Sequence, residues 1–236
     1  MTSLDINAVR DFYNSTPEIW APDDDWHQWS YKVIYNYLSA HSFSTEEYVL
    51  NAGSGGNSYG INANMVHVDI AEEKLKGIEN AVISNVEKMP FPSAVFDGII
   101  CVGSVINYCD ASAAITEFSR VLKSKGRLIL EFESSAGYEY KGTSIYEKSA
   151  DIVTVQFQGQ DHNQWLYSPP YMRALLSASS FKVKQVFPFQ ILSSLVLHLN
   201  GDEKRSVKYA RYDVAARKLP LVAAHANNII LNCQKL

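Results

Sequence analysis

This chain has few cysteines, no long apolar segment and no surplus of positive charge, and each shortage excludes a class of protein. Its 236 residues include three cysteines, Cys101, Cys109 and Cys233, which form no C-x-x-C pair and predict buried thiols in a reducing compartment. The longest nearly apolar run, ILSSLVLHL, is too short to span a bilayer, and charge from the fifth residue argues against a secretory signal. We therefore expect a cytoplasmic protein with no membrane insertion.

The charge balance argues against nucleic acid as the main partner. A formal net charge of −4 at pH 7 leaves no general basic surface for a phosphate backbone. Basic residues concentrate between Lys204 and Lys218, but acidic neighbours partly offset them, so we expect a solvated helix face there. We expect no nucleic-acid partner and no metal site, and the sequence leaves the oligomeric state open.

What the chain does have is a regular alternation of apolar strands with helical segments. Its length, with 47% apolar and 19% charged residues, predicts one domain over residues 1–236 that carries insertions. Five strands are expected at residues 47–52, 65–70, 81–85, 95–104 and 127–133. A helix is expected over residues 110–126, with Asp110 or Ser112 as its cap and Gly126 at its end. Strands alternating with helices predict a parallel sheet flanked by helices.

Three segments fall outside this alternation. Residues 1–45 have helical spacing and many aromatics, and they predict an N-terminal helical lid. Residues 134–168 contain an alternating stretch, DIVTVQFQ, that predicts one extra strand, and residues 190–222 form a long polar and helical connection. Between and after these insertions we expect a helix opened by proline at residues 168–179 and strands at residues 181–189 and 227–236.

The glycine-rich stretch NAGSGGNSYG after the first strand suggests a ligand loop with three possible ligands. A phosphate-binding P-loop needs lysine and a hydroxyl residue where Ile61 and Asn62 stand. A dinucleotide loop needs a third glycine where Ser58 stands. A nucleoside without phosphate fits better, because Asp69 ends the second strand, where it would accept hydrogen bonds from two ribose hydroxyls. Only NSYGINAN separates the glycines from the next strand, so the first crossover helix should be stunted and the N-terminal segment should cover the ligand.

Four stretches in the same order resemble the class I S-adenosylmethionine-dependent methyltransferases: YVLNAGSGG, VHVDIAEEKL, SNVEKMPFPSAVFDGIICVGSVINY and FSRVLKSKGRLILEFE. The resemblance covers about ninety residues and implies S-adenosylmethionine as cofactor. It also implies an α/β, three-layer doubly wound fold. The seven-stranded, mostly parallel sheet would have the order 3-2-1-4-5-7-6, with the last strand antiparallel.

The resemblance also implies which residues bind the cofactor. Asp69 would hold the ribose, with Ile70 against the adenine, and Tyr13 would contact the cofactor from the N-terminal segment. The residues around the methionine part would be Asn51, Ala52, Gly53, Ser54 and Gly55. The residues near the adenine would be Asn85, Val86 and Glu87, and those lining the pocket after the fourth strand would be Cys101, Val102 and Gly103.

The expected reaction is methyl transfer to oxygen or nitrogen of a small molecule. A sulfonium methyl group is already electrophilic, so alignment matters most, and a base is needed only for a protonated nucleophile. The candidates for catalysis are Glu133, His162 and His27, chosen by position. The aromatic N-terminal region and the two insertions, residues 134–168 and 190–222, would select a small-molecule substrate.

Two alternatives stay open. Asn51 and Asn85 stand where the family usually has an acidic residue and an aspartate, and no base is evident. These features favour a catalytically silent sensor or scaffold that binds S-adenosylmethionine. A nicotinamide-dependent oxidoreductase is a weaker alternative, which Ser58 disfavours.

Overall fold

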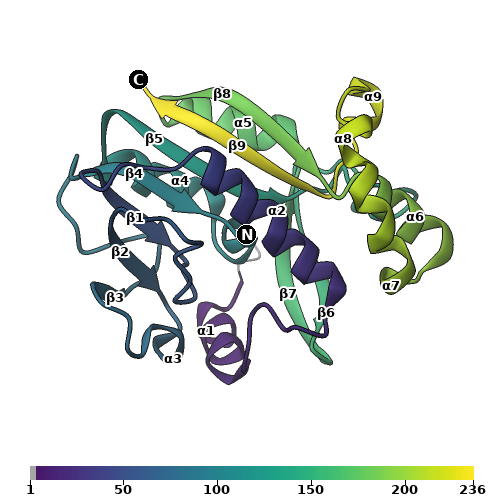
Figure 1. The fold of residues 1–236 in the computed structure, drawn as a ribbon, viewed down its shortest axis with the longest axis horizontal. Coiled ribbons are helices and arrows are strands. Elements are labelled where there is room, and N and C mark those ends of the chain that lie inside the picture. The colour runs from purple at the N-terminus through teal and green to yellow at the C-terminus, as the bar shows by residue number, and fades with distance from the viewer. Residues whose placement is uncertain (1–3) are drawn as a thin grey trace.

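A mixed sheet of seven strands organises the computed structural model, which describes residues 4–236 (Figure 1). Its strands lie in the order β3-β2-β1-β4-β5-β9-β8. Their bounds are β1 Tyr48–Ala52, β2 Asn64–Asp69, β3 Ala81–Ile83, β4 Phe96–Cys101, β5 Leu122–Glu133, β8 Phe181–Phe189 and β9 Asn228–Lys235. Strand β9 runs antiparallel to both neighbours, β5 and β8, whereas the pairs among β1 to β5 are parallel. The expected strand order and the antiparallel last strand are confirmed.

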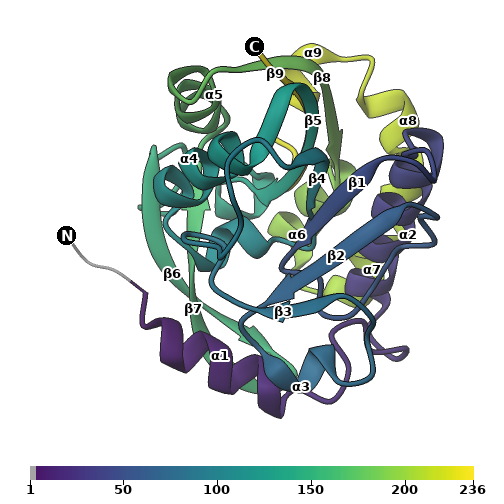
Figure 2. The same cartoon turned by 90° about the vertical axis from the view of Figure 1, so that its left-hand side faces the viewer.

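Helices cover both faces of this sheet (Figure 2). On one face lie α4, Ala111–Val121, and α5, Pro169–Ala178, which pack Phe118 and Leu176 against alternate strand residues such as Leu130. On the other face lies α2, Asp25–Ala40. Its Ile34 and Leu38 pack in a cluster with the strand residues that point to this second face, such as Ile129. This alternation along each strand is the two-residue period of a sheet that is buried on both faces.

Helix α4 ends earlier than the sequence suggests. Asp110 caps it as expected, because its carboxylate accepts from the Ser112 nitrogen at 2.8 Å. The helix stops at Val121 and not at Gly126, so the prediction for its end is wrong. Leu122 is fully buried and pairs with Phe96, which draws residues 122–126 into β5.

The first crossover has no helix. Residues 53–63, all of which the structure describes, connect β1 to β2 through turns and bends. The expected stunted helix is therefore reduced to a loop. Helix α2, which precedes β1 in sequence, lies over the same face of the sheet and packs Ile34 and Tyr37 with Val49 of β1.

The insertions form a hairpin and a helical cluster. β6, Ala150–Phe157, and β7, Gln160–Tyr167, pair as a separate antiparallel sheet, where the sequence predicted a single strand. The second strand was missed because its first four residues are polar and mostly exposed. Between β8 and β9 in sequence lie α6 Leu192–Asn200, α7 Glu203–Ser206, α8 Asp213–Ala216 and α9 Pro220–Ala223, which gather at one side of the molecule, on the right in Figure 1. The remaining helices are α1 Ile6–Ser15, α3 Glu72–Leu75, η1 Val105–Tyr108, η2 Tyr138–Tyr140 and η3 Val207–Tyr212. Among residues 4–236, no helix is both long and apolar enough to cross a membrane.

Candidate functional site

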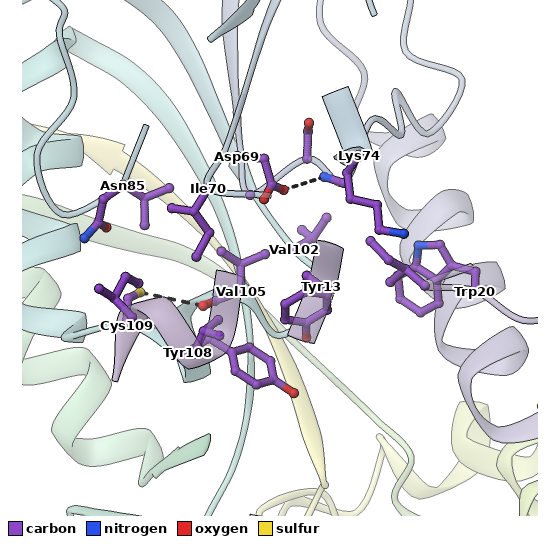
Figure 3. Close-up of a pocket in the computed structure, with 18 of the residues that line it drawn as sticks. Tyr13, Trp20, Asp69, Ile70, Lys74, Asn85, Val102, Val105, Tyr108 and Cys109 are labelled. Atoms are coloured by element: carbon purple, nitrogen blue, oxygen red, sulfur yellow. Dashed lines mark hydrogen bonds between the residues drawn. The ribbon is translucent and has the colours of Figure 1, made fainter. Parts of the chain in front are cut away.

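A cavity lies where the loops after β1, β2 and β4 meet, at the carboxyl ends of these parallel strands (Figure 3). We call it the loop cavity. The predicted cofactor residues that line it are Tyr13, Gly53, Ser54, Gly55, Asp69, Ile70, Asn85, Val86, Val102 and Gly103. Open α/β sheets bind ligands at this edge, where strand order reverses between β1 and β4.

Asp69 joins two loops of the cavity. Its Oδ2 accepts from the Gly55 nitrogen at 2.8 Å, and its Oδ1 accepts from the Ala71 nitrogen at 2.9 Å. Burial raises the pKa of this carboxyl, and the backbone hydrogen bonds act in the opposite direction. Because each carboxylate oxygen has more than one acceptor site, both retain capacity for a ligand hydroxyl.

The glycines bring the backbone close to the opposite wall of the cavity. A β-carbon on Gly53 would lie 2.3 Å from Cγ1 of Val105, and one on Gly55 would lie 2.5 Å from Cδ1 of Ile19. Both residues also have positive φ, at 69° and 52°. A side chain at either position would therefore meet an existing wall residue and strain the backbone.

Four predicted cofactor residues do not line the loop cavity. Asn51 is 1% exposed, and its Nδ2 donates to the Asn57 carbonyl at 2.7 Å, so it supports the loop from inside. Ala52 and Cys101 are fully buried in the core. Glu87 accepts from the Asp110 nitrogen at 2.9 Å and lines a separate groove. For these four residues the structure places the side chain behind or beside the cavity.

The N-terminal segment closes the cavity. Tyr13 packs edge-on against Tyr108, with ring centroids 5.3 Å apart, and burial raises the pKa of the Tyr13 hydroxyl. Lys74 Nζ donates to the Thr16 carbonyl and ties the segment to α3. The lining residues that were not predicted to contact the cofactor are Ile6, Val9, Ile19, Trp20, Tyr59, Lys74, Val105, Tyr108 and Cys109. Most are apolar, so their local sequence does not separate a cavity wall from ordinary core.

A second cavity of about 330 Å³ adjoins the first, and we call it the acidic chamber. Both cavities are lined by Tyr13, Ile19, Trp20, Gly103 and Tyr108. All three predicted catalytic residues, Glu133, His162 and His27, line the chamber. Its other acidic lining residues are Glu131, Glu139 and Glu203.

The predicted catalytic residues are already engaged by neighbours. Glu133 accepts from the Tyr140 hydroxyl and from Gln164 Nε2, and burial raises its pKa. His162 Nε2 lies 2.7 Å from the Tyr108 hydroxyl, and burial lowers the pKa of this ring. His27 Nδ1 lies 2.6 Å from Oδ2 of Asp24, so its nearest carboxylate is not one of the chamber glutamates.

Glu131 is the strongest candidate that sequence reasoning missed. It is fully buried at the end of β5, and it accepts from the Ser104 nitrogen at 2.6 Å and from Asn228 Nδ2 at 2.8 Å. Burial raises its pKa to about 7. The signal was a charged residue inside the apolar run RLILEFE, which is rare without a partner or a role.

Comparisons with known proteins match part of the chain. Residues 43–130 match the family model described as a methyltransferase domain. An uncharacterized protein of Methanocaldococcus jannaschii is 35% identical over 104 residues, or 42% of this chain and 41% of that protein. The ubiquinone/menaquinone biosynthesis C-methyltransferase of Pasteurella multocida is 34% identical over 105 residues, or 39% of this chain and 38% of that protein. The matches with these two relatives therefore span about two fifths of the relatives' own lengths.

Solved structures share the whole architecture at low sequence identity. A putative S-adenosylmethionine-dependent methyltransferase from Listeria monocytogenes aligns with a TM-score of 0.65 and 12% identity over 89% of this chain and 99% of that one. The Burkholderia thailandensis 1,6-didemethyltoxoflavin-N1-methyltransferase, with bound 1,6-didemethyltoxoflavin and S-adenosylhomocysteine, aligns with a TM-score of 0.56 and 14% identity over 100% and 91%. Residues 43–130 therefore match a methyltransferase domain, and the sheet has the strand order expected for the class I S-adenosylmethionine-dependent methyltransferase fold.

Proposed function

We propose that this protein transfers a methyl group from S-adenosylmethionine to an oxygen or nitrogen atom of a small molecule. The observation that carries the proposal is the junction of two cavities: a loop cavity built on Asp69 and an acidic chamber beside it that is open to a second ligand. An enzyme needs both spaces, whereas a sensor needs only the first. The open chamber therefore favours methyl transfer over the silent alternative.

The residues of the loop cavity fit the proposed cofactor. Asp69 offers two acceptor oxygens for the ribose hydroxyls, and Ile70 and Val86 offer apolar surface for the adenine. Asn85 uses its Oδ1 for the Glu87 nitrogen at 2.9 Å, which leaves its amide N–H groups for an adenine acceptor. Gly53 and Gly55 let the backbone approach the amino-acid part.

In this reaction the main task of the protein is to position the methyl acceptor against the cofactor. When bound, S-adenosylmethionine supplies a methyl group that is electrophilic because it is bonded to a sulfonium. Tyr13, Trp20 and Tyr108, shared by both cavities, would hold the acceptor in line and exclude water. A proton that leaves the acceptor would pass to Glu133, whose pKa burial raises, or to His162, whose pKa burial lowers so that its ring is neutral near pH 7.

The known relatives support the reaction class and leave the acceptor atom open. The Burkholderia protein is an N1-methyltransferase of a small heterocycle, and the Pasteurella protein is a C-methyltransferase. Our choice of oxygen or nitrogen rests on the polar lining of the chamber. Carbon acceptors would be better served by an apolar one.

Titration calorimetry with S-adenosylmethionine, S-adenosylhomocysteine and NAD tests the proposal. We expect the first two to bind with similar micromolar affinity and NAD to show no heat of binding. Binding of NAD alone would refute the proposal in favour of an oxidoreductase. Binding of the cofactor without formation of S-adenosylhomocysteine across a broad panel of small molecules would favour the sensor.

A further inference from the structure

We propose that the acidic chamber takes a substrate that carries a protonated amine. This inference rests on the proposed function, because it names the chemical class of the small molecule that would enter the chamber. Three independent observations carry it: the sign of the charges, the balance of hydrogen-bond acceptors over donors, and the absence of a metal-binding arrangement.

The charges that line the chamber are of one sign. Glu131, Glu133 and Glu139 face it from β5 and η2, and Glu203 lies exposed at its rim. Among the described residues, neither lysine nor arginine lines this space. Burial raises the pKa of Glu131 to about 7 and that of Glu139 to about 8, because water is excluded and no cation of the chain compensates. An ammonium group would supply that compensation.

The histidines offset this negative charge only in part, because His27 lowers the pKa of Glu133 and of Glu203 while burial raises both. His27 lies 2.6 Å from Asp24, so any charge that it carries is matched by its own carboxylate. Burial lowers the pKa of His162, which keeps its ring neutral near pH 7. Among the described residues, the only side chain of the chamber that can offset its glutamates is therefore His27, which is already paired with Asp24.

Three amide donors of the chamber are already used, whereas Nδ1 of His162 has no partner within residues 4–236. Gln164 Nε2 donates to Glu133 at 2.8 Å, and Asn228 Nδ2 donates to Glu131 at 2.8 Å. Gln190 is fully buried and donates from Nε2 to Ser30 Oγ at 2.9 Å. Its Oε1, in contrast, has no partner within residues 4–236. A buried acceptor without a partner is destabilising, so the ligand is expected to bring the N–H group that satisfies it.

The glutamates are not arranged as a metal site. Within the part of the chain that the structure describes, no group of three or more His, Cys, Asp or Glu side chains could hold a metal ion. The aromatic walls point to an organic cation instead, since Trp26, Phe157 and Tyr108 also line the chamber. Its volume of about 330 Å³ suits a small molecule.

Binding of matched probes to the full chain tests this inference. The protein is first titrated with S-adenosylhomocysteine and then, when saturated with it, with three sets of compounds that share a skeleton. These are 2-phenylethylamine, 2-phenylethanol and 3-phenylpropionate; tryptamine, tryptophol and indole-3-propionate; and 1,4-diaminobutane, 1,4-butanediol and succinate. We expect at least one amine to bind about tenfold or more tightly than its matched alcohol and acid.

Two substitutions with one control assign the effect to the chamber. Glu133→Gln and Glu139→Gln should each raise the Kd of the preferred amine by about 10- to 100-fold, as expected for a lost hydrogen bond to a charged group. The Kd of the matched alcohol should change much less. Glu46→Gln, an exposed change near the opposite edge of the sheet, should leave both unchanged. Unaltered affinity for S-adenosylhomocysteine shows that each variant is folded.

The outcomes separate the two proposals. Failure of S-adenosylhomocysteine to bind would overturn the proposed function together with this inference. If it binds, the inference alone is overturned when no amine binds, when the alcohols or acids bind as tightly as the amines, or when calcium chloride stabilises the protein and the amines do not. It is also overturned if Glu139→Gln weakens amine and alcohol equally.

Discussion

Replacing Asp69 by asparagine tests the central residue of the loop cavity. The carboxylate accepts from two backbone nitrogens, those of Gly55 and Ala71, and we assign its remaining acceptor sites to the ribose. Asp69→Asn keeps the shape and one acceptor oxygen but removes the charge. Hydrogen bonds to a charged group are worth about 1.5–3 kcal/mol and neutral ones about 0.5–1.5. We therefore expect the variant to bind S-adenosylhomocysteine about 10- to 100-fold more weakly.

Asparagine is preferable to alanine because of the two loop contacts. Asp69→Ala leaves both backbone nitrogens without this partner, at a cost of about 1–3 kcal/mol each. The sum is a large part of the roughly 5–15 kcal/mol that stabilises a typical domain. Loss of binding in the alanine variant would therefore confuse the ribose contact with local unfolding.

The assay pairs calorimetric titration of S-adenosylhomocysteine with urea unfolding. Asp97→Asn is a matched control, since Asp97 also accepts a backbone nitrogen, that of Tyr48 at 3.0 Å, and lies at the start of β4, away from the cavity. We expect both variants to lose similar stability and only Asp69→Asn to lose affinity. Unchanged affinity in a folded Asp69→Asn protein would refute the ribose assignment.

Two further changes test the cavity wall and the buried glutamate. Gly53→Ala should weaken S-adenosylhomocysteine binding and destabilise the fold more than Gly77→Ala. Both glycines have positive φ, but only a β-carbon on Gly53 would overlap the side chain of Val105. Equal unfolding midpoints of the two variants would contradict this predicted overlap. Glu131→Gln should change the pH dependence of stability. The folded pKa of Glu131 is about 7 against an ordinary 4.5, so its protonation stabilises the native protein below pH 4.5, and this contribution is lost as pH rises through 7. The free energy of unfolding of the variant, relative to the wild type, should therefore rise by roughly 3 kcal/mol between pH 5 and pH 8, and parallel curves would contradict the assigned pKa.

Sequence alone was enough to place the framework of the loop cavity. Gly53 and Asn85 come just after a strand and Asp69 ends one, and the carboxyl ends of neighbouring parallel strands meet at one edge of the sheet. The positions of these residues then depend on strand order, which the four family-like stretches predicted. Once the strand order is known, residues at the carboxyl ends of neighbouring strands must lie close together. Their placement at one site could therefore be predicted without knowing how the side chains pack.

Only the tertiary structure decided what surrounds that framework. The acidic chamber is lined by Glu131 of β5 and Glu139 of η2. His27 of α2 and Gln190, which follows β8, line the same chamber although they lie far away in sequence. The N-terminal cover over Gly55 depends likewise on Ile19, whose local sequence resembles ordinary core. These contacts join residues far apart in the chain, and the free energy that selects them comes from packing and desolvation, which local sequence patterns do not encode.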